Sequence, residues 1–154
     1  MNTYDLIVIG GGPGGYVAAL YASQLKAKVC LVEKAEIGGT CLNRGCIPTK
    51  AILASASVFR MAKKSGSYGV NIQGLNCDFS AVIARKNKIV QQLVNGIKFL
   101  FKKRGIEIVN GEGILIDANK VEVKKSDGTT QILSANKIII ATGSEPANIP
   151  GINF

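Results

Sequence analysis

The sequence contains no histidine among its 154 residues. Histidine is the commonest general base near neutral pH, so chemistry that needs an imidazole is excluded for this chain. Its absence also removes one of the two usual zinc ligands, and the cysteines do not have C-x-x-C spacing. We therefore predict no metal site.

Two targeting signals are missing as well. No apolar run approaches the ~20 residues that a membrane-spanning helix needs. Residues 1–10 have neither the basic start nor the small-residue cleavage site of a secretory signal. We expect a cytoplasmic protein with no membrane partner, and in that compartment a disulfide is more often catalytic than structural.

Acidic residues are scarce, with 10 Asp and Glu against 19 Lys and Arg, which gives a net charge of +9. Part of the excess lies in residues 79–104, which contain no acidic side chain. A basic patch can bind nucleic acid, but this segment has no interleaved aromatic residues for base stacking and matches no nucleic-acid-binding motif. We interpret it as a solvated face and predict no nucleic-acid partner. Its basic residues are Arg85, Lys86, Lys88, Lys98, Lys102, Lys103 and Arg104.

The rest of the composition is that of a folded domain. Hydrophobic residues make up 47% of the chain and charged residues only 19%. Such a chain can bury enough apolar surface to offset the entropy lost on ordering, which argues against intrinsic disorder. Its length suits a single domain with a sizeable core.

The N-terminal third predicts a strand, a helix and a second strand. The apolar run 6–9 ends in a cluster of glycines, an apolar helical segment follows, and a second apolar run covers 29–32. Strand, helix and strand within about thirty residues indicate a βαβ unit with a parallel strand pair.

Two further helices are predicted. Residues 49–64 are apolar on much of the helix circumference, so we expect this helix to pack on the sheet. Apolar residues keep helical spacing from Phe79 to Phe101, with Asp78 or Ser80 as N-cap and Gly105 as the stop.

Short strands fill the C-terminal third. The first, 106–109, is followed by three candidates separated by turns, and a last apolar strand, 137–140, precedes Ala141. The three candidates, 113–116, 121–124 and 130–133, predict a small antiparallel meander. The fold class is therefore α/β, with a parallel sheet and this meander.

A glycine motif, Gly10-x-Gly12-x-x-Gly15, lies between the first strand and the first helix. Glycines here permit a tight turn, let backbone N–H groups approach a pyrophosphate, and allow close packing of helix on strand. Glu33 ends the second strand, about 20 residues on, where a carboxylate can accept hydrogen bonds from a ribose. Because the motif stands in this context, we predict dinucleotide binding rather than a plain glycine-rich turn.

A cysteine pair, Cys41 and Cys46, lies among Gly, Asn and Arg residues rather than in an apolar run. Two unrelated buried thiols are the alternative interpretation. On an ideal helix the two Cα atoms would be ~8–9 Å apart, beyond disulfide range, so a bridge requires a distorted turn, which Gly45 and Pro48 favour. Basic neighbours at a helix start, Arg44 among them, are expected to lower the thiol pKa values.

The run from Gly38 to Lys50 resembles the redox-active signature of the pyridine nucleotide-disulfide oxidoreductases, a family of flavoproteins. The resemblance covers residues 4–154 and implies a Rossmann-like FAD-binding fold. Within the family, the glycine motif with its flanking residues and the Cys-Leu-Asn and Cys-Ile-Pro triplets are most similar to members that oxidise dihydrolipoamide.

The resemblance implies an FAD site assembled from the whole chain. The glycine turn would hold the pyrophosphate, Glu33 the ribose of the AMP half, and Gly113 the adenine through its backbone, although Gly113 is otherwise a plain strand-entry glycine. The residues implied are Gly10, Gly12, Gly14, Gly15, Glu33, Lys34, Gly39, Thr40, Cys41, Lys50, Gly113, Ala141, Thr142 and Gly143.

The resemblance also implies the catalytic roles. Cys41 would exchange disulfides with the substrate, and Cys46 would lie next to the flavin and form the charge-transfer complex. Lys50 matches a lysine near flavin N5, although it could be an ordinary solvated lysine. Cys30 and Cys77 match no redox motif, and Cys30 is most simply a core residue. Arg44 departs from the family pattern, in which an apolar residue is commoner at this position.

The resemblance finally implies that this chain supplies only part of an enzyme, and that further domains lie in sequence that it does not contain. Residues 1–150 would be an incomplete FAD-binding domain, and 151–154 the start of the connection to a domain that binds NAD+. Lipoyl-bearing domains of 2-oxo acid dehydrogenase or glycine cleavage complexes would be partners of a full-length homodimer. We expect the segment alone to be inactive and to bind FAD weakly or not at all. The alternatives are a mercuric or glutathione reductase type of enzyme, or a stand-alone nucleotide-binding module without turnover.

Overall fold

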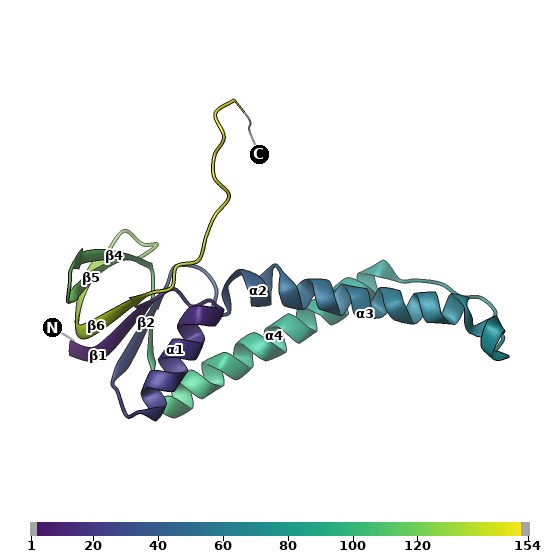
Figure 1. Cartoon of the computed structure of the whole chain (residues 1–154), viewed down its shortest axis with the longest axis horizontal. Helices are drawn as coiled ribbons and strands as arrows, with labels where there is room; N and C mark the ends of the chain where they lie inside the picture. The colour runs from purple at the N-terminus through teal and green to yellow at the C-terminus, as the bar shows by residue number, and fades with distance from the viewer. Residues whose placement is uncertain (1–2, 152–154) are drawn as a thin grey trace.

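The computed structural model of the chain describes residues 3–151 and contains one six-stranded sheet beside a long helical hairpin (Figure 1). The strand order is β3-β2-β1-β6-β5-β4, with β1, β2 and β3 parallel to one another. The strands are β1 (Thr3–Ile9), β2 (Val29–Glu33), β3 (Glu107–Asn110), β4 (Glu112–Asp117), β5 (Lys120–Lys124) and β6 (Thr130–Ile140). Helix α1 (Pro13–Gln24) connects β1 to β2, which confirms the predicted βαβ unit.

Strand β6 joins the two parts of the sheet. Its first residues pair with β5 in antiparallel orientation, and Ser134–Ile140 pair with β1 in parallel orientation. The expectation of two separate strands, 130–133 and 137–140, is therefore wrong, because no glycine or proline interrupts residues 134–136. The side chain of Asn119 donates to the carbonyls of Ala135 and Asn136 at 2.8 and 3.1 Å, which supports β6 where it changes partners.

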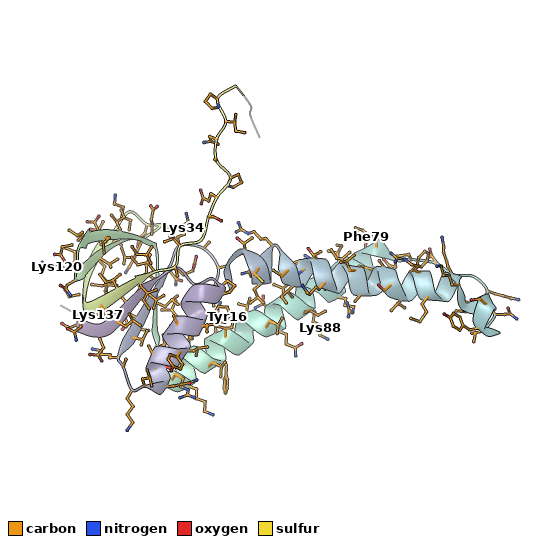
Figure 2. The ribbon with its side chains drawn as sticks, viewed as in Figure 1. Tyr16, Lys34, Phe79, Lys88, Lys120 and Lys137 are labelled. Atoms are coloured by element: carbon orange, nitrogen blue, oxygen red, sulfur yellow. The ribbon has the colours of Figure 1, made fainter. Side chains whose placement is uncertain are left out.

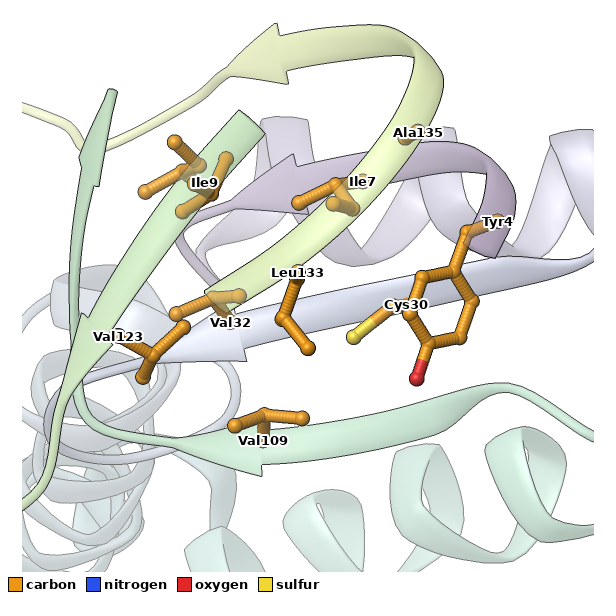
Figure 3. Packing of buried hydrophobic residues seen from close by; sticks show 10 residues of the cluster. Tyr4, Ile7, Ile9, Cys30, Val32, Val109, Val123, Leu133 and Ala135 are labelled. Atoms are coloured by element: carbon orange, nitrogen blue, oxygen red, sulfur yellow. The ribbon is translucent and has the colours of Figure 1, made fainter. Parts of the chain in front are cut away.

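Alternate residues of the parallel strands enter two cores, one on each face of the sheet. On one face, Ile7, Cys30 and Val109 pack with residues of the meander formed by β4, β5 and the start of β6, including Leu133 (Figure 3). On the other face, residues such as Leu31 pack against α1 and the C-terminal half of α4 (Phe79–Arg104). Cys30 is fully buried, which confirms it as a core residue.

The helical hairpin extends away from the sheet (Figure 1). It consists of α3 (Cys46–Lys63), the short 3-10 helix η1 (Ser65–Tyr68) and α4. The expectation that α3 packs on the sheet is wrong, since α3 packs along α4, where Arg85 donates to the carbonyl of Ala51 at 3.0 Å. The outer side of α3 remains open, and Val58 and Met61 are 69% and 70% exposed.

The ends of α4 agree with the prediction. Asp78 is the N-cap, and its carboxylate accepts from the backbone N–H of Ala81 at 3.0 Å, while Gly105 ends the helix in the left-handed conformation. Its basic residues, including Lys88 (Figure 2), are exposed except for the half-buried Lys86. Residues 46–104 hold eleven of the nineteen Lys and Arg residues but only one acidic residue, so the positive charge of the chain is concentrated on the hairpin.

Within residues 3–151, none of the helices combines the length and the apolar character that crossing a membrane requires.

Candidate functional site

The glycine turn between β1 and α1 is closed by backbone packing that leaves no space for a side chain at Gly10 or Gly15. Gly10 has φ +103°, and a Cβ there would lie 2.3 Å from the carbonyl oxygen of Ala141. A Cβ on Gly15 would lie 1.8 Å from the carbonyl oxygen of Gly10. Ala141 is held in place because its N–H donates to the carbonyl of Ile9 at 2.8 Å. The glycine turn and two of the predicted cofactor residues, Ala141 and Thr142, therefore meet at one end of the parallel strands.

The N-terminus of α1 is open to an anionic ligand. Gly12 is the N-cap, makes no side-chain capping bond, and no acidic residue follows in the first turn. The first amides of a helix have no partner within it, and together with the helix dipole they favour a negative group. Gly14 has no atom within 4 Å of the position its Cβ would take. This space and these amides fit the pyrophosphate of a dinucleotide.

Glu33 lies beside the turn and already binds it. One carboxylate oxygen accepts from the backbone N–H of Gly11, and the other accepts from that of Ala35 at 2.7 Å. A carboxylate has about four lone-pair sites, so two remain for the hydroxyls of a ribose. The Gly11 contact was not predicted, since nothing in the sequence indicates which amide a strand-end carboxylate reaches.

A cleft of about 210 Å³ opens next to Glu33. Five of the predicted cofactor residues line it: Gly10, Glu33, Lys34, Gly113 and Thr142. Lys34 lies beside the point where the C-terminal segment leaves the sheet (Figure 2), and its ammonium pairs with the exposed carboxylate of Glu145 at 3.3 Å. Gly143 follows Thr142 as an exposed residue at the start of this segment. The structure thus brings together residues from four distant parts of the chain.

The segment 38–50, which carries the cysteine pair, is docked directly on the glycine turn. The N–H of Gly38 donates to the carbonyl of Gly11 at 2.8 Å. Gly39, at φ +58°, begins α2 (Gly39–Asn43), and a Cβ on it would lie 2.7 Å from the Cα of Gly12. Thr40, the next residue, is exposed. Any ligand on the glycine turn would therefore lie close to the helix that carries Cys41.

The cysteine pair lies where the helix breaks. Helix α2 ends at Asn43, Gly45 has φ −121° and ψ −103°, and α3 begins at Cys46. This is the distorted turn that the spacing requires. Both cysteines are free thiols; Cys46 is exposed and Cys41 half-buried.

The pKa of Cys41 differs from the prediction. A hydrogen bond with the Cys46 side chain raises the pKa of Cys41 above its ordinary value, while the charge of Lys50 acts in the opposite direction and is outweighed. The expectation of a lowered pKa is therefore wrong for Cys41. The physical reason is the direct contact between the two thiols, which favours the protonated form more than the nearby charge favours the thiolate.

The basic residues of the segment have different surroundings. Lys50 is exposed on α3, one helical turn beyond Cys46. The guanidinium of Arg44 forms an exposed ion pair with Glu36 at 3.2 Å, which gives this unusual residue a partner in the loop that precedes α2. Cys77 is exposed in the loop before α4, in the hairpin rather than in the segment 38–50.

One residue of this segment was missed by the sequence reasoning. The side-chain amide of Asn43 donates to the carbonyls of Ile37 and Gly39 at 3.1 and 3.0 Å. Asparagine is common at the ends of helices because it bonds nearby backbone groups, and that position was the available signal. Across residues 3–151 no group of acidic, cysteine or histidine side chains is arranged to hold a metal ion.

Comparison with known proteins agrees with this geometry. Residues 4–153 match the family described as pyridine nucleotide-disulphide oxidoreductase. The chain is 49% identical over 152 residues to a dihydrolipoyl dehydrogenase of Acholeplasma laidlawii, covering 97% of this chain and 44% of that protein. It is 46% identical over 149 residues to a dihydrolipoyl dehydrogenase of Chlorobaculum parvum, covering 97% of this chain and 32% of that protein.

A solved structure is similar in fold. An HOCl-induced flavoprotein disulfide reductase from Escherichia coli, determined as a Cu(II) complex, superposes with a TM-score of 0.76 at 28% identity, over 97% of this chain and 31% of that one. The chain thus spans between about a third and under a half of the length of these relatives. On its sequence, fold and site, the chain belongs to the flavin-dependent pyridine nucleotide-disulphide oxidoreductase family.

Proposed function

We propose that this chain is the FAD-binding and dithiol-bearing part of an enzyme that oxidises dihydrolipoamide to lipoamide and reduces NAD+. The single observation that carries the proposal is the placement of Cys41 and Cys46 on either side of a helix break, in a segment that is bonded to a dinucleotide-type glycine turn. The names of the relatives favour dihydrolipoamide over other dithiols. Nicotinamide binding is assigned to sequence that this chain does not contain.

The residues present fit FAD. The open N-terminus of α1 suits the pyrophosphate, and the cleft lined by Glu33, Lys34 and Gly113 suits the adenosine. Lys50 and Cys46 on α3 would lie toward the flavin ring, as the resemblance implies. When bound, FAD would supply a two-electron acceptor for the cysteine pair.

The chemistry of the cysteines is thiol–disulfide exchange. With the pair in its disulfide form, one thiolate of dihydrolipoamide attacks the sulfur of Cys41, and Cys46 leaves as a thiolate. The second thiolate of the substrate then attacks the sulfur that is bonded to Cys41, which closes the lipoamide ring and releases the Cys41 sulfur. The substrate loses two electrons and two protons, and the protein gains a pair of thiols.

Larger partners follow from the same proposal. Lipoyl-bearing domains of 2-oxo acid dehydrogenase or glycine cleavage complexes would deliver the dithiol, and the full-length form would be a homodimer. We also propose a cytoplasmic location.

The exchange chemistry can be tested on this chain without the cofactor. In a Cys46→Ser variant, we expect Cys41 to open the ring of oxidised lipoamide and to retain it as a mixed disulfide, which mass spectrometry detects as an adduct on Cys41. Cys77→Ser in the same background should keep the adduct, and Cys41→Ser should lose it. Adduct formation on Cys77 instead of Cys41 would refute the assignment.

A second titration separates the alternatives. The chain is titrated with FAD and then with dihydrolipoamide, glutathione or a non-thiol reductant. A long-wavelength absorbance band that appears with dihydrolipoamide and is lost in Cys46→Ser supports the proposal. Flavin binding without this band supports a nucleotide-binding module, and a response to glutathione alone supports a reductase of the glutathione type.

A further inference from the structure

Helix α2 is too short to hold its own position. It contains five residues, Gly39–Asn43, with Cys41 at its centre. Isolated helices of this length are not stable in water, because one turn cannot offset the entropy of nucleation. The place of Cys41 relative to the glycine turn therefore depends on contacts that α2 makes with its surroundings.

The amide of Asn43 supplies two of these contacts. It donates to the carbonyls of Ile37 and Gly39, which flank Gly38 on both sides. Gly38 in turn donates its N–H to Gly11 in the glycine turn. One side chain thus holds the last residue of α2 against the tripeptide 37–39 that joins α2 to the dinucleotide-type turn.

We propose that Asn43 is a positioning residue, which keeps Cys41 in register with Cys46 and with the glycine turn through its bonds to residues 37–39. The catalytic consequence of this role rests on the proposed function, whereas the test below measures only the position and the titration of Cys41 and uses no substrate. Both hydrogen bonds of the Asn43 amide go to backbone carbonyls. It acts on Cys41 through the backbone of the segment that Cys41 belongs to.

The neighbouring ion pair is a weaker alternative for this role. Arg44 and Glu36 also connect α2 to the loop before it, but their side chains are 69% and 56% exposed. Exposed ion pairs contribute little, because water screens the charges and two long side chains lose freedom. The bonds of Asn43 are partly buried and involve a short side chain, so they are the stronger connection.

The surroundings of Asn43 allow its hydrogen bonds to be removed without a change in core packing. Its side chain lines an open cleft of about 310 Å³ together with Gln91 and Val94. Truncation to alanine therefore enlarges a solvent-filled space and leaves no closed cavity in either core. The main loss in Asn43→Ala is the pair of hydrogen bonds.

The experiment compares Asn43→Ala with Asn95→Ala in the thiol form of this chain, without FAD. Asn95 lies exposed on α4, where its side chain accepts from Gln91. Hydrogen exchange of the Gly38 amide is expected to become about tenfold faster in Asn43→Ala and to stay unchanged in Asn95→Ala. The exchange of β1 amides should not change in either variant, which shows that the sheet remains folded.

A pH profile supplies the readout that a purely structural role would not move. Alkylation of Cys41 is followed by mass spectrometry across pH 6–11. Loss of its contact with Cys46 is expected to move the midpoint of Cys41 alkylation to lower pH in Asn43→Ala, toward that of an ordinary thiol. The Asn95→Ala midpoint should match the parent chain.

Unchanged Gly38 exchange and an unchanged Cys41 midpoint in folded Asn43→Ala would overturn the proposal. If that variant does not fold, Asn43→Ser carries the same test with an expected increase of about threefold, because its hydroxyl can reach only one carbonyl. Failure of Cys41 to react with lipoamide in the separate exchange experiment would refute the proposed function alone, since no measurement on Asn43 depends on a substrate.

Discussion

The contact between Gly15 and Gly10 gives the sharpest prediction about the stability of the dinucleotide-type turn. A Cβ on Gly15 would lie 1.8 Å from the carbonyl oxygen of Gly10, whereas real Cβ contacts are essentially never under 3.0 Å. The two elements must therefore separate by about 1.2 Å in Gly15→Ala. Gly10 is fixed to the sheet because its N–H donates to the carbonyl of Val32 at 2.8 Å, so the movement falls on α1.

Movement of α1 has an energetic cost that can be estimated. Ala19 of α1 is fully buried against the sheet, and a shift of this size breaks its packing. Overpacking a close-packed site costs typically ~1–3 kcal/mol. We expect a loss of about 3 kcal/mol in Gly15→Ala, which corresponds to a fall in Tm of about 6–12 °C for a domain of this size.

Urea unfolding followed by circular dichroism measures this loss, and Gly14→Ala is the matched control. Gly14 lies one residue earlier on the same helix, and its added Cβ meets nothing within 4 Å. That variant should be as stable as the parent or up to ~1 kcal/mol more stable, because alanine favours helix. A free energy of unfolding for Gly15→Ala within about 0.5 kcal/mol of the control would refute the steric reasoning.

Three further predictions concern single side chains. In Glu33→Gln, one of the two carboxylate oxygens that accept from backbone N–H groups becomes an NH2 donor. We expect a loss of about 1–3 kcal/mol in urea unfolding and weaker binding of AMP. Equal stability and affinity would contradict the role of Glu33. Arg44→Leu should lower the free energy of unfolding by less than ~1 kcal/mol at low salt and not at all at 1 M salt. A larger loss in urea unfolding would show that the pair with Glu36 stabilises the fold more than an exposed ion pair does. Burial, aided by the charge of Glu107, raises the pKa of Cys30 from 9.0 to about 12. As the pH rises, the thiol therefore loses its proton in the unfolded chain before it does so in the folded one. The free energy of unfolding then falls between pH 9 and 12 by up to ~1.4 kcal/mol per pH unit. Cys30→Val should flatten that alkaline decline in urea titrations, and an identical decline in both proteins would contradict the cause.

The sequence predicts best the elements that are specified by local signals. The bounds of α4 follow from the Asp78 cap and the Gly105 stop, which act within one helical turn. The first βαβ unit follows from apolar runs on each side of a glycine cluster, and its parallel pairing is confirmed. The glycine and cysteine motifs are each visible as short strings of residue types, so their existence required no tertiary information.

The failed expectations depend on which surfaces meet. The composition of α3 shows that this helix is apolar on several sides but does not show what covers it, and only the side toward α4 is covered in residues 3–151. The length of β6 was missed because its two halves pair with different strands, and each half looks like a complete short strand. The pKa of Cys41 depends on the distance to Cys46, which the helix break sets.

The two motifs are linked more closely than their separation in sequence suggests. The peptide groups of Gly11 bind both ends of the loop that follows β2, because its N–H donates to Glu33 and its carbonyl accepts from Gly38. The length of this loop is therefore constrained, since Glu33 is paired with Asn110 in the sheet and the backbone of Gly39 lies against Gly12. A cysteine pair placed by this loop keeps one position relative to the turn, as the proposed function requires. Gly39 thus leaves out a side chain so that the backbone of Gly12 can approach, whereas a Cβ on Gly12 would lie 3.9 Å from the Cα of Gly39, an ordinary contact.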